Sequence, residues 1–129
     1  MIVGKRFKIE IAHKLDLPYE SKCKNIHGHT EVVEVMLYGD VMEDGMVIDF
    51  SDIGKIRDEL DHKFLNGIIK QPTAENIAKY IADRVARIVT EKGRKVYGGI
   101  VRVYETENNW VEYGFEIVDG EAKEVGRSG

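Results

Sequence analysis

The sequence predicts an α+β fold in which a four-stranded antiparallel sheet carries two helices on one face, in the order β-β-α-α-β-β. Two observations predict it. The apolar residues alternate with period two near both ends of the chain, and their spacing changes to the helical period in the middle. With 129 residues, 43% of them hydrophobic, the chain is expected to form one domain with a modest core.

The first two strands are predicted at residues 5–13 and 30–38. The first alternates strictly, with Phe7, Ile9, Ile11 and His13 on one face. The second is apolar on both faces, which indicates that both faces of the sheet are covered. After a turn at 43–45, residues 46–50 are expected to return as a short strand, and strands at 99–106 and 110–117 complete the sheet.

The two helices are predicted in the middle of the chain. Ser51 or Asp49 is expected to cap the first, which ends near 61–62. Thr73 is the expected N-cap of the second, whose apolar stripe runs from 77 to 89. Two helices cover only one face, so a second copy is expected on the other, as a homo-oligomer. The domain is expected to span 1–118, followed by a flexible polar tail at 119–129.

Composition excludes several classes of protein. No stretch approaches ~18 consecutive apolar residues, so no membrane partner is expected, and the N-terminus does not resemble a signal peptide. One cysteine forms no intrachain disulfide and fits a reducing cytoplasm. The formal net charge of −4, with no basic stripe, argues against a nucleic-acid partner.

A histidine pair marks the candidate functional site. His27 and His29 flank Gly28 just before the second strand, four residues after the single cysteine, Cys23. On a strand these imidazoles share a face with Cα atoms ~6.5–7 Å apart, and they can converge on one metal ion. Two surface histidines at a loop edge explain the pair equally well. His13, at the end of an apolar strand face, also fits a buried core histidine.

Taken together, six short motifs run in order over residues 7 to about 115. The first motif combines residue 7 and residues 12–15, and the second combines Cys23 and residues 27–29. The other four are residues 47–50, 60–66, 72–76 and 105–106. In this pattern the chain resembles the family of 6-pyruvoyl-tetrahydropterin and 6-carboxy-tetrahydropterin synthases. The resemblance implies the tunnelling fold, in which subunits join their sheets into barrels, commonly as hexamers.

The resemblance also implies a site. It assigns a zinc ion to His13, His27 and His29, with a fourth position open to substrate. A closed structural site with Cys23 as fourth ligand is the competing interpretation. The open site makes Cys23 the catalytic base.

Four further residues receive roles from the resemblance. Asp61 and His62 would assist the Cys23 thiolate, although a solvated helix end also explains them. Glu105 would bind the pterin edge as a bidentate acceptor, although an exposed charge is ordinary there. Thr73 would contact substrate, although helix capping is sufficient to explain it.

The implied substrate is 7,8-dihydroneopterin triphosphate. The three-residue spacer between Cys23 and His27 resembles the carboxy type, which releases acetaldehyde and triphosphate and leaves 6-carboxy-5,6,7,8-tetrahydropterin for deazaguanine (queuosine- or archaeosine-type) synthesis. The alternatives are the pyruvoyl type, which keeps the side chain, and a non-catalytic zinc- or pterin-binding oligomer. The chain departs from the family at 10–11, where small residues are frequent, and at Glu31, where many relatives are apolar. Triphosphate-binding residues stay open, with Lys14, Lys22 and Lys24 as nearby charges.

Overall fold

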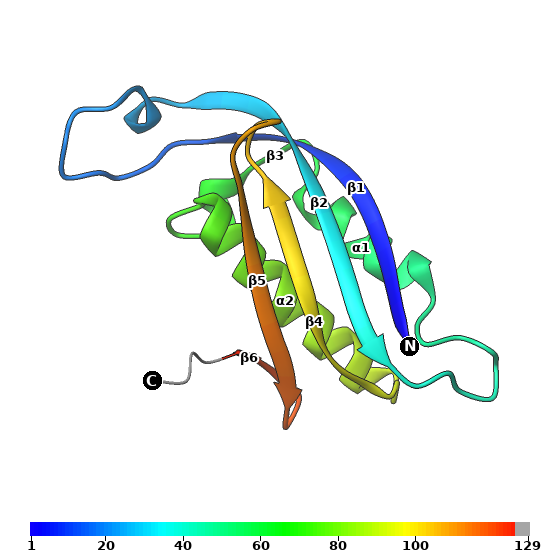
Figure 1. Cartoon of the computed structure of the whole chain (residues 1–129). Coiled ribbons are helices and arrows are strands. Elements are labelled where there is room, and N and C mark those ends of the chain that lie inside the picture. The colour runs from blue at the N-terminus through cyan, green and yellow to red at the C-terminus, as the bar shows by residue number, and fades with distance from the viewer. Residues whose placement is uncertain (126–129) are drawn as a thin grey trace.

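The computed structural model describes residues 1–125 as one curved sheet with two helices on one face (Figure 1). The predicted α+β class is therefore confirmed, but the described residues form six strands rather than four, in the order β3-β1-β2-β4-β5-β6. The long strands are β1 (Ile2–His13), β2 (His27–Gly39), β4 (Val96–Tyr104) and β5 (Trp110–Val118). Short strands β3 (Lys63–Phe64) and β6 (Glu121–Glu124) flank them.

The β1–β2 pairing positions the candidate site. The two strands are antiparallel over their full length, from Ile2 opposite Tyr38 to His13 opposite His27. The predicted motif residues therefore meet at one end of the sheet. The connection 14–26, which includes the short helix η1 (Lys22–Lys24), projects beyond that end (Figure 1).

The core lies between the sheet and the helices α1 (Phe50–Leu60) and α2 (Ala74–Glu91). Ile77, Ile81 and Val85 form the buried stripe of α2, as predicted. Burying each such side chain contributes roughly 1.5–3 kcal/mol. Thr73 is the N-cap: its Oγ1 accepts a hydrogen bond from the Asn76 N–H at 3.1 Å.

The predicted strand at 46–50 is wrong. Phe50 begins α1, and Asp49 caps it by accepting a hydrogen bond from the Ser51 N–H at 2.9 Å. The carbonyl oxygens of Met46 and Val47 accept hydrogen bonds from the Arg94 guanidinium instead of from a strand. A side chain 47 residues away thus satisfies the backbone here, which no local pattern reveals.

The sheet continues past residue 118, into the segment expected to be a flexible tail. Asp119 and Gly120 form a turn with positive φ, and β6 pairs with β5 from Glu121 to Glu124. Residues 126–129 of the expected tail lie outside the described residues. The 3-10 helix η2 (Leu65–Gly67) directly follows β3. None of the described helices has the length and apolar character needed to cross a membrane.

Candidate metal centre and adjoining pocket

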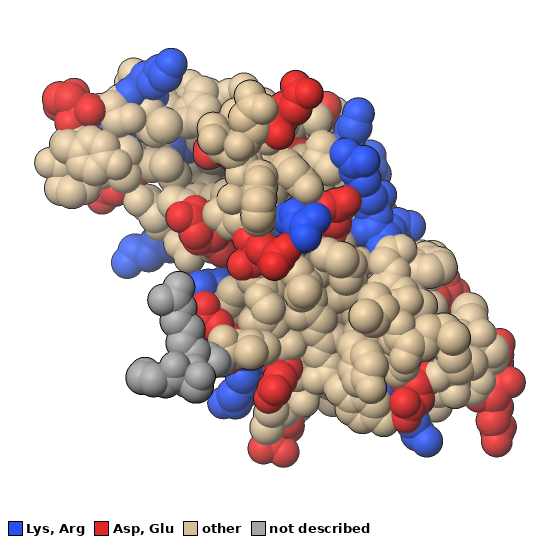
Figure 2. Space-filling view, viewed as in Figure 1, with Lys and Arg blue, Asp and Glu red and all other residues tan. Residues whose placement is uncertain are grey.

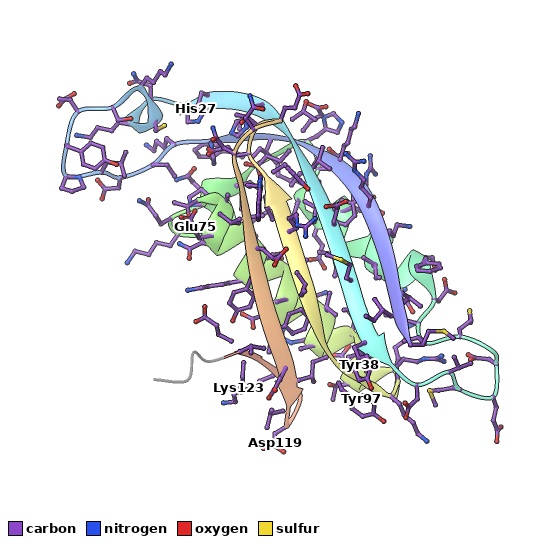
Figure 3. The ribbon with its side chains drawn as sticks, viewed as in Figure 1. His27, Tyr38, Glu75, Tyr97, Asp119 and Lys123 are labelled. Carbon is purple, nitrogen blue, oxygen red and sulfur yellow. The ribbon has the colours of Figure 1, made fainter. Side chains whose placement is uncertain are left out.

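Three histidine side chains converge where β1 ends and β2 begins. The Nε2 atom of His13 lies 3.0 Å from that of His27 and 2.9 Å from that of His29. His13 is completely buried, and the other two are partly exposed. Figure 3 places His27 at the start of β2, at the opposite end of the sheet from Tyr38 and Tyr97.

The other ring nitrogen of each histidine has a backbone partner. His13 Nδ1 lies 2.7 Å from the Pro72 carbonyl, His27 Nδ1 lies 2.8 Å from the Asn25 carbonyl, and His29 Nδ1 lies 3.1 Å from the Glu105 carbonyl. A carbonyl oxygen only accepts, so each Nδ1 carries the proton and donates it. In the neutral imidazoles all three Nε2 atoms then carry bare lone pairs that face one another.

This arrangement fits a metal cation. Two lone pairs that each lie about 3 Å from a third repel it unless a positive charge lies among them. Neutral Nε2 is the usual imidazole ligand of a metal ion. Fixing the ring through Nδ1 is the common support for such ligands. Burial lowers the pKa of His13, and the nearby His29 and His27 rings lower it further, outweighing the opposing effect of the Pro72 carbonyl. His13 is therefore held neutral, as a ligand must be.

A pocket of about 290 Å³ opens beside the histidines. Its lining is Lys22, Cys23, His27, His29, Glu105 and Thr106. The projecting connection supplies Cys23, and the segment after β4 supplies Glu105. The pocket therefore brings together residues more than 80 positions apart in the sequence, such as Cys23 and Thr106.

Cys23 lies in η1, where its backbone N–H donates to Ser21 Oγ at 3.2 Å and its carbonyl accepts from the Leu15 N–H at 2.8 Å. Its sulfur belongs to neither of the candidate metal-ligand groups found among the described residues, in which all ligand atoms lie within 4.8 Å of one another. This geometry favours the open site over a closed one with Cys23 as ligand, and it leaves the thiol facing the pocket.

Asp61 and His62 lie away from this pocket in the described chain. Asp61 caps the end of α1, accepts from the Glu10 N–H at 2.8 Å and pairs with Arg57 at 3.0 Å. His62 is 78% exposed and adopts a left-handed conformation, with φ of 58°. That backbone brings its Nε2 to 3.6 Å from Asp61 Oδ2. Asp61 and His62 therefore form the predicted pair, but within a single chain this pair does not lie in the pocket that Cys23 lines.

Thr73 also lies outside the lining of the pocket, and its hydroxyl is committed to capping α2. Its neighbour Pro72 contributes instead, through the carbonyl that orients His13. The start of α2 therefore supports the site through its backbone.

Sequence reasoning missed one site residue, Glu31. Its side chain is completely buried two residues beyond His29, with Oε1 3.8 Å from His29 Nε2. Burial raises its pKa to about 8, and the charge of Glu105 contributes. The signal available in the sequence was an acid among the apolar residues of a core-facing strand.

Comparisons with known proteins identify the family of the chain. The family model for 6-pyruvoyl tetrahydropterin synthase matches residues 2–116. The chain belongs to that family. A protein of Archaeoglobus fulgidus named "Putative 6-carboxy-5,6,7,8-tetrahydropterin synthase" is 41% identical, over 87% of this chain and 94% of its own. The 6-carboxy-5,6,7,8-tetrahydropterin synthase of Haemophilus influenzae is 30% identical, over 86% and 96%.

A solved structure shares the fold of this synthase-family chain. The 6-pyruvoyl tetrahydropterin synthase of Caenorhabditis elegans superposes with a TM-score of 0.70 at 25% identity, over 88% of this chain and 94% of its own. The tunnelling fold expected from the motifs is therefore confirmed. Membership in the 6-pyruvoyl tetrahydropterin synthase family places the chain among enzymes of pterin metabolism.

Proposed function

We propose that this chain is a zinc-dependent lyase that converts 7,8-dihydroneopterin triphosphate and one water molecule to 6-carboxy-5,6,7,8-tetrahydropterin, acetaldehyde and triphosphate. The observation that carries the proposal is the single pocket lined by Cys23, two of the converging histidines and Glu105. A base, a metal site and a carboxylate for the pterin edge are the three groups that this chemistry needs. Relatives named for the carboxy-type reaction support the choice of product.

In this proposal the residues of the site have different roles in the reaction. His13, His27 and His29 would hold the zinc ion. When bound, the ion supplies positive charge that makes the hydroxyl groups of the substrate side chain more acidic. The Cys23 thiolate takes a proton from the side-chain carbon next to the ring. Glu105 accepts two parallel hydrogen bonds from the amino and ring N–H edge of the pterin.

Lys22 contributes a positive charge to the same pocket lining. It is therefore a candidate contact for the triphosphate, together with Lys14 and Lys24. This role stays a proposal, as do the roles of Asp61, His62 and Thr73.

A pyruvoyl-type reaction is the second candidate. A relative in Dictyostelium discoideum named 6-pyruvoyl tetrahydrobiopterin synthase is 35% identical over 71% of this chain and 73% of its own. The three-residue spacer between Cys23 and His27 favours the carboxy type, because spacer length sets where the thiolate sits relative to the histidines.

Product analysis tests the proposal. Zinc-loaded protein is incubated with 7,8-dihydroneopterin triphosphate, and the products are separated and identified. Release of acetaldehyde and triphosphate with 6-carboxy-5,6,7,8-tetrahydropterin is the expected result. Pyruvoyl-tetrahydropterin without acetaldehyde would replace the carboxy-type proposal with the second candidate. Substrate binding without turnover would indicate a non-catalytic binding protein.

We also propose that the chain works as a homo-oligomer, with a hexamer expected from the family resemblance. On the sheet face opposite the helices, Figure 2 shows a cluster of charged side chains across the middle and a broad surface without charges below it. Tyr38 and Tyr97, exposed by 55% and 48%, lie at one end of that face (Figure 3). At the edge of the sheet, β3 pairs with β1 only at Ile11 and Ala12, which leaves most of β1 without a strand on that side in residues 1–125.

A further inference from the structure

Glu31 is a buried acid that the proposed reaction does not use. It lies on the core-facing side of β2, in line with His29 and Val33, and it is completely buried. Within the described residues, both of its carboxylate oxygens are without a hydrogen-bond partner. An isolated carboxyl group in such a place costs several kcal/mol unless a charge or donor compensates it.

The surroundings of Glu31 offer no cation from the protein. Ile9, opposite it on β1, is completely buried, and no Lys or Arg nitrogen in residues 1–125 lies within 4 Å of its carboxylate. The nearest charged group is the carboxylate of Glu105, whose ligand atom falls with those of Glu31 and His29 in a group spanning no more than 4.8 Å. Two carboxyl groups and an imidazole thus share this space without a cation from the described residues.

The proposed metal centre lies directly beside this carboxylate. Glu31 Oε1 is 3.8 Å from His29 Nε2, the same nitrogen that faces His13 Nε2 at 2.9 Å. In a tetrahedral site with bonds of ~2.0–2.1 Å, neighbouring donor atoms are ~3.3 Å apart. Glu31 Oε1 is therefore ~0.5 Å beyond ligand spacing from His29 Nε2. Because no candidate group in the described residues joins Glu31 to His13 or His27, its side chain must turn toward the histidines to ligate the same ion.

A second metal ion does not explain Glu31. His29 Nδ1 donates to the Glu105 carbonyl, so only its Nε2 is free to ligate. One nitrogen lone pair serves one ion. A second ion held by the group of His29, Glu31 and Glu105 would therefore compete with the first ion for His29 Nε2.

We propose that Glu31 is an additional, anionic ligand of the ion held by His13, His27 and His29, an inference that rests on the metal site of the proposed function. The ligand set becomes three imidazoles and one carboxylate, and the net charge of the loaded site falls from +2 to +1. Zinc also adopts five-coordination, so a substrate oxygen still has a place. Glu31 strengthens metal retention and adds a hard oxygen donor to a nitrogen site.

Metal binding by Glu31→Gln tests the assignment, because this variant keeps the shape of the side chain and removes its charge. Zinc affinity is measured by competition with a chelator, and the visible spectrum is recorded for the Co²⁺-loaded protein. Zinc is expected to bind ~10–100-fold more weakly, by analogy with other groups that support metal sites, with a changed Co²⁺ spectrum. Glu34→Gln, on the opposite face of β2 and paired with Arg102, is the matched control and should resemble the wild type.

The outcomes separate the two proposals. If the wild type binds zinc and Glu31→Gln binds it equally well with the same Co²⁺ spectrum, the role of Glu31 is overturned and the three-histidine site stands. If the wild type binds no zinc, both fall.

Thermal unfolding excludes a merely structural role. Without metal, Glu31→Gln should unfold close to the melting temperature of the wild type, because an unpartnered amide of the same shape replaces an unpartnered carboxyl. Zinc should raise the melting temperature of this variant less than that of the wild type. If Glu31→Gln does not fold, Glu31→Asp takes its place. This variant shortens the reach by one methylene and should also bind zinc more weakly, and unchanged affinity would overturn the proposal.

Discussion

At the scale of single residues, backbone carbonyls orient the three imidazoles. The carbonyls of Pro72, Asn25 and Glu105 each hold one Nδ1 proton, and so they fix which nitrogen faces the centre. Because these acceptors belong to the backbone, side-chain substitutions leave them in place. The metal site is therefore most sensitive to changes in the histidines themselves.

His27→Ala is expected to abolish tight zinc binding. Loss of a supporting group alone weakens metal sites by ~10–100-fold, so loss of a ligand should weaken this one by more than ~100-fold. Zinc content per chain, measured after dialysis by atomic emission, checks the expectation. His62→Ala is the control, because His62 is exposed and lies outside the candidate ligand groups of residues 1–125. Full zinc retention in variants of all three histidines would contradict the site.

Cys23→Ala is expected to remove turnover while zinc binding and folding persist. The sulfur lines the pocket but joins neither candidate metal-ligand group in the described residues, so its loss should not release the ion. General-base catalysis contributes ~10²–10⁴-fold, and the rate should fall at least that far. Product formation and zinc content are measured on the same sample. Loss of zinc together with activity would instead support a closed site with Cys23 as ligand.

At the scale of secondary-structure elements, one ion pair joins the two helices. Glu59 of α1 accepts from Arg84 Nε at 3.0–3.1 Å and from its Nη2 at 2.7 Å, and Tyr80 donates to the same carboxylate at 3.1 Å. The hydrogen bonds from Arg84, which outweigh the opposing effect of burial, lower the pKa of Glu59, and the Tyr80 bond adds to them. The pair is only partly buried, so its contribution is expected to be about 1 kcal/mol.

Glu59→Gln should therefore destabilise the fold in a pH-dependent way. The folded-state pKa of Glu59 lies below its unfolded value, so the carboxylate contributes fully above about pH 4.5 and loses its contribution as the pH falls through the folded pKa. Urea denaturation should show the wild type about 1 kcal/mol more stable at pH 7, with the difference shrinking in acid. A double-mutant cycle with Arg84→Met isolates the pair, and a pH-independent difference would contradict the assignment.

Gly99 is required where three strands of the curved sheet meet. It pairs with Leu37 of β2 and Phe115 of β5, and an added Cβ would lie 2.2 Å from the Met36 carbonyl oxygen. Gly99→Ala should lower the free energy of unfolding by about 3 kcal/mol, the upper range for overpacking. Gly114→Ala is the matched strand control, because its Cβ would meet nothing closer than 3.9 Å. Equal unfolding midpoints for the two variants would show that the sheet relaxes around Gly99.

The elements with a clear period were predictable from sequence, and those that depend on distant partners were not. The alternation of Phe7, Ile9 and Ile11 and the cap at Thr73 are local signals, and both were confirmed. Residues 46–50 have the local pattern of a strand. Their carbonyl groups bind the distant Arg94 side chain instead, and a local pattern cannot predict that contact. Strand β6 was not predicted for a similar reason. Its polar residues pair with the edge of the sheet without burying an apolar face, so they show no strand pattern in the sequence.

Some residues of the candidate site were predictable from sequence, but their arrangement was not. Histidine spacing and motif order predicted which side chains belong together, and His13, His27 and His29 do converge. The Nδ1 partners could not be predicted, because a backbone carbonyl leaves no trace in residue type. The burial of Glu31 without a partner depends on the core around it, which the sequence alone does not reveal.

At the scale of the whole molecule, the separation of Asp61 and His62 from Cys23 bears on how the subunits assemble. One chain places Cys23 in the pocket of the projecting connection and His62 on the surface beside β3. Tyr19 and Ile26 of that connection are 63% and 66% exposed, which is typical of a segment that packs against another copy. If His62 assists Cys23, it must come from a neighbouring subunit.

Mixing two inactive variants is expected to restore activity. Cys23→Ala and His62→Ala are unfolded together, mixed in equal amounts and refolded, so that subunits combine at random. A site made from Cys23 of one copy and His62 of another is intact at about a quarter of the interfaces, because each copy supplies the unmutated residue half of the time. Light scattering should show that every sample is oligomeric, and turnover should recover to about a quarter of the wild type. A mixture as inactive as its parents, in an oligomer of the same size, would show that Cys23 and His62 do not share a site across subunits.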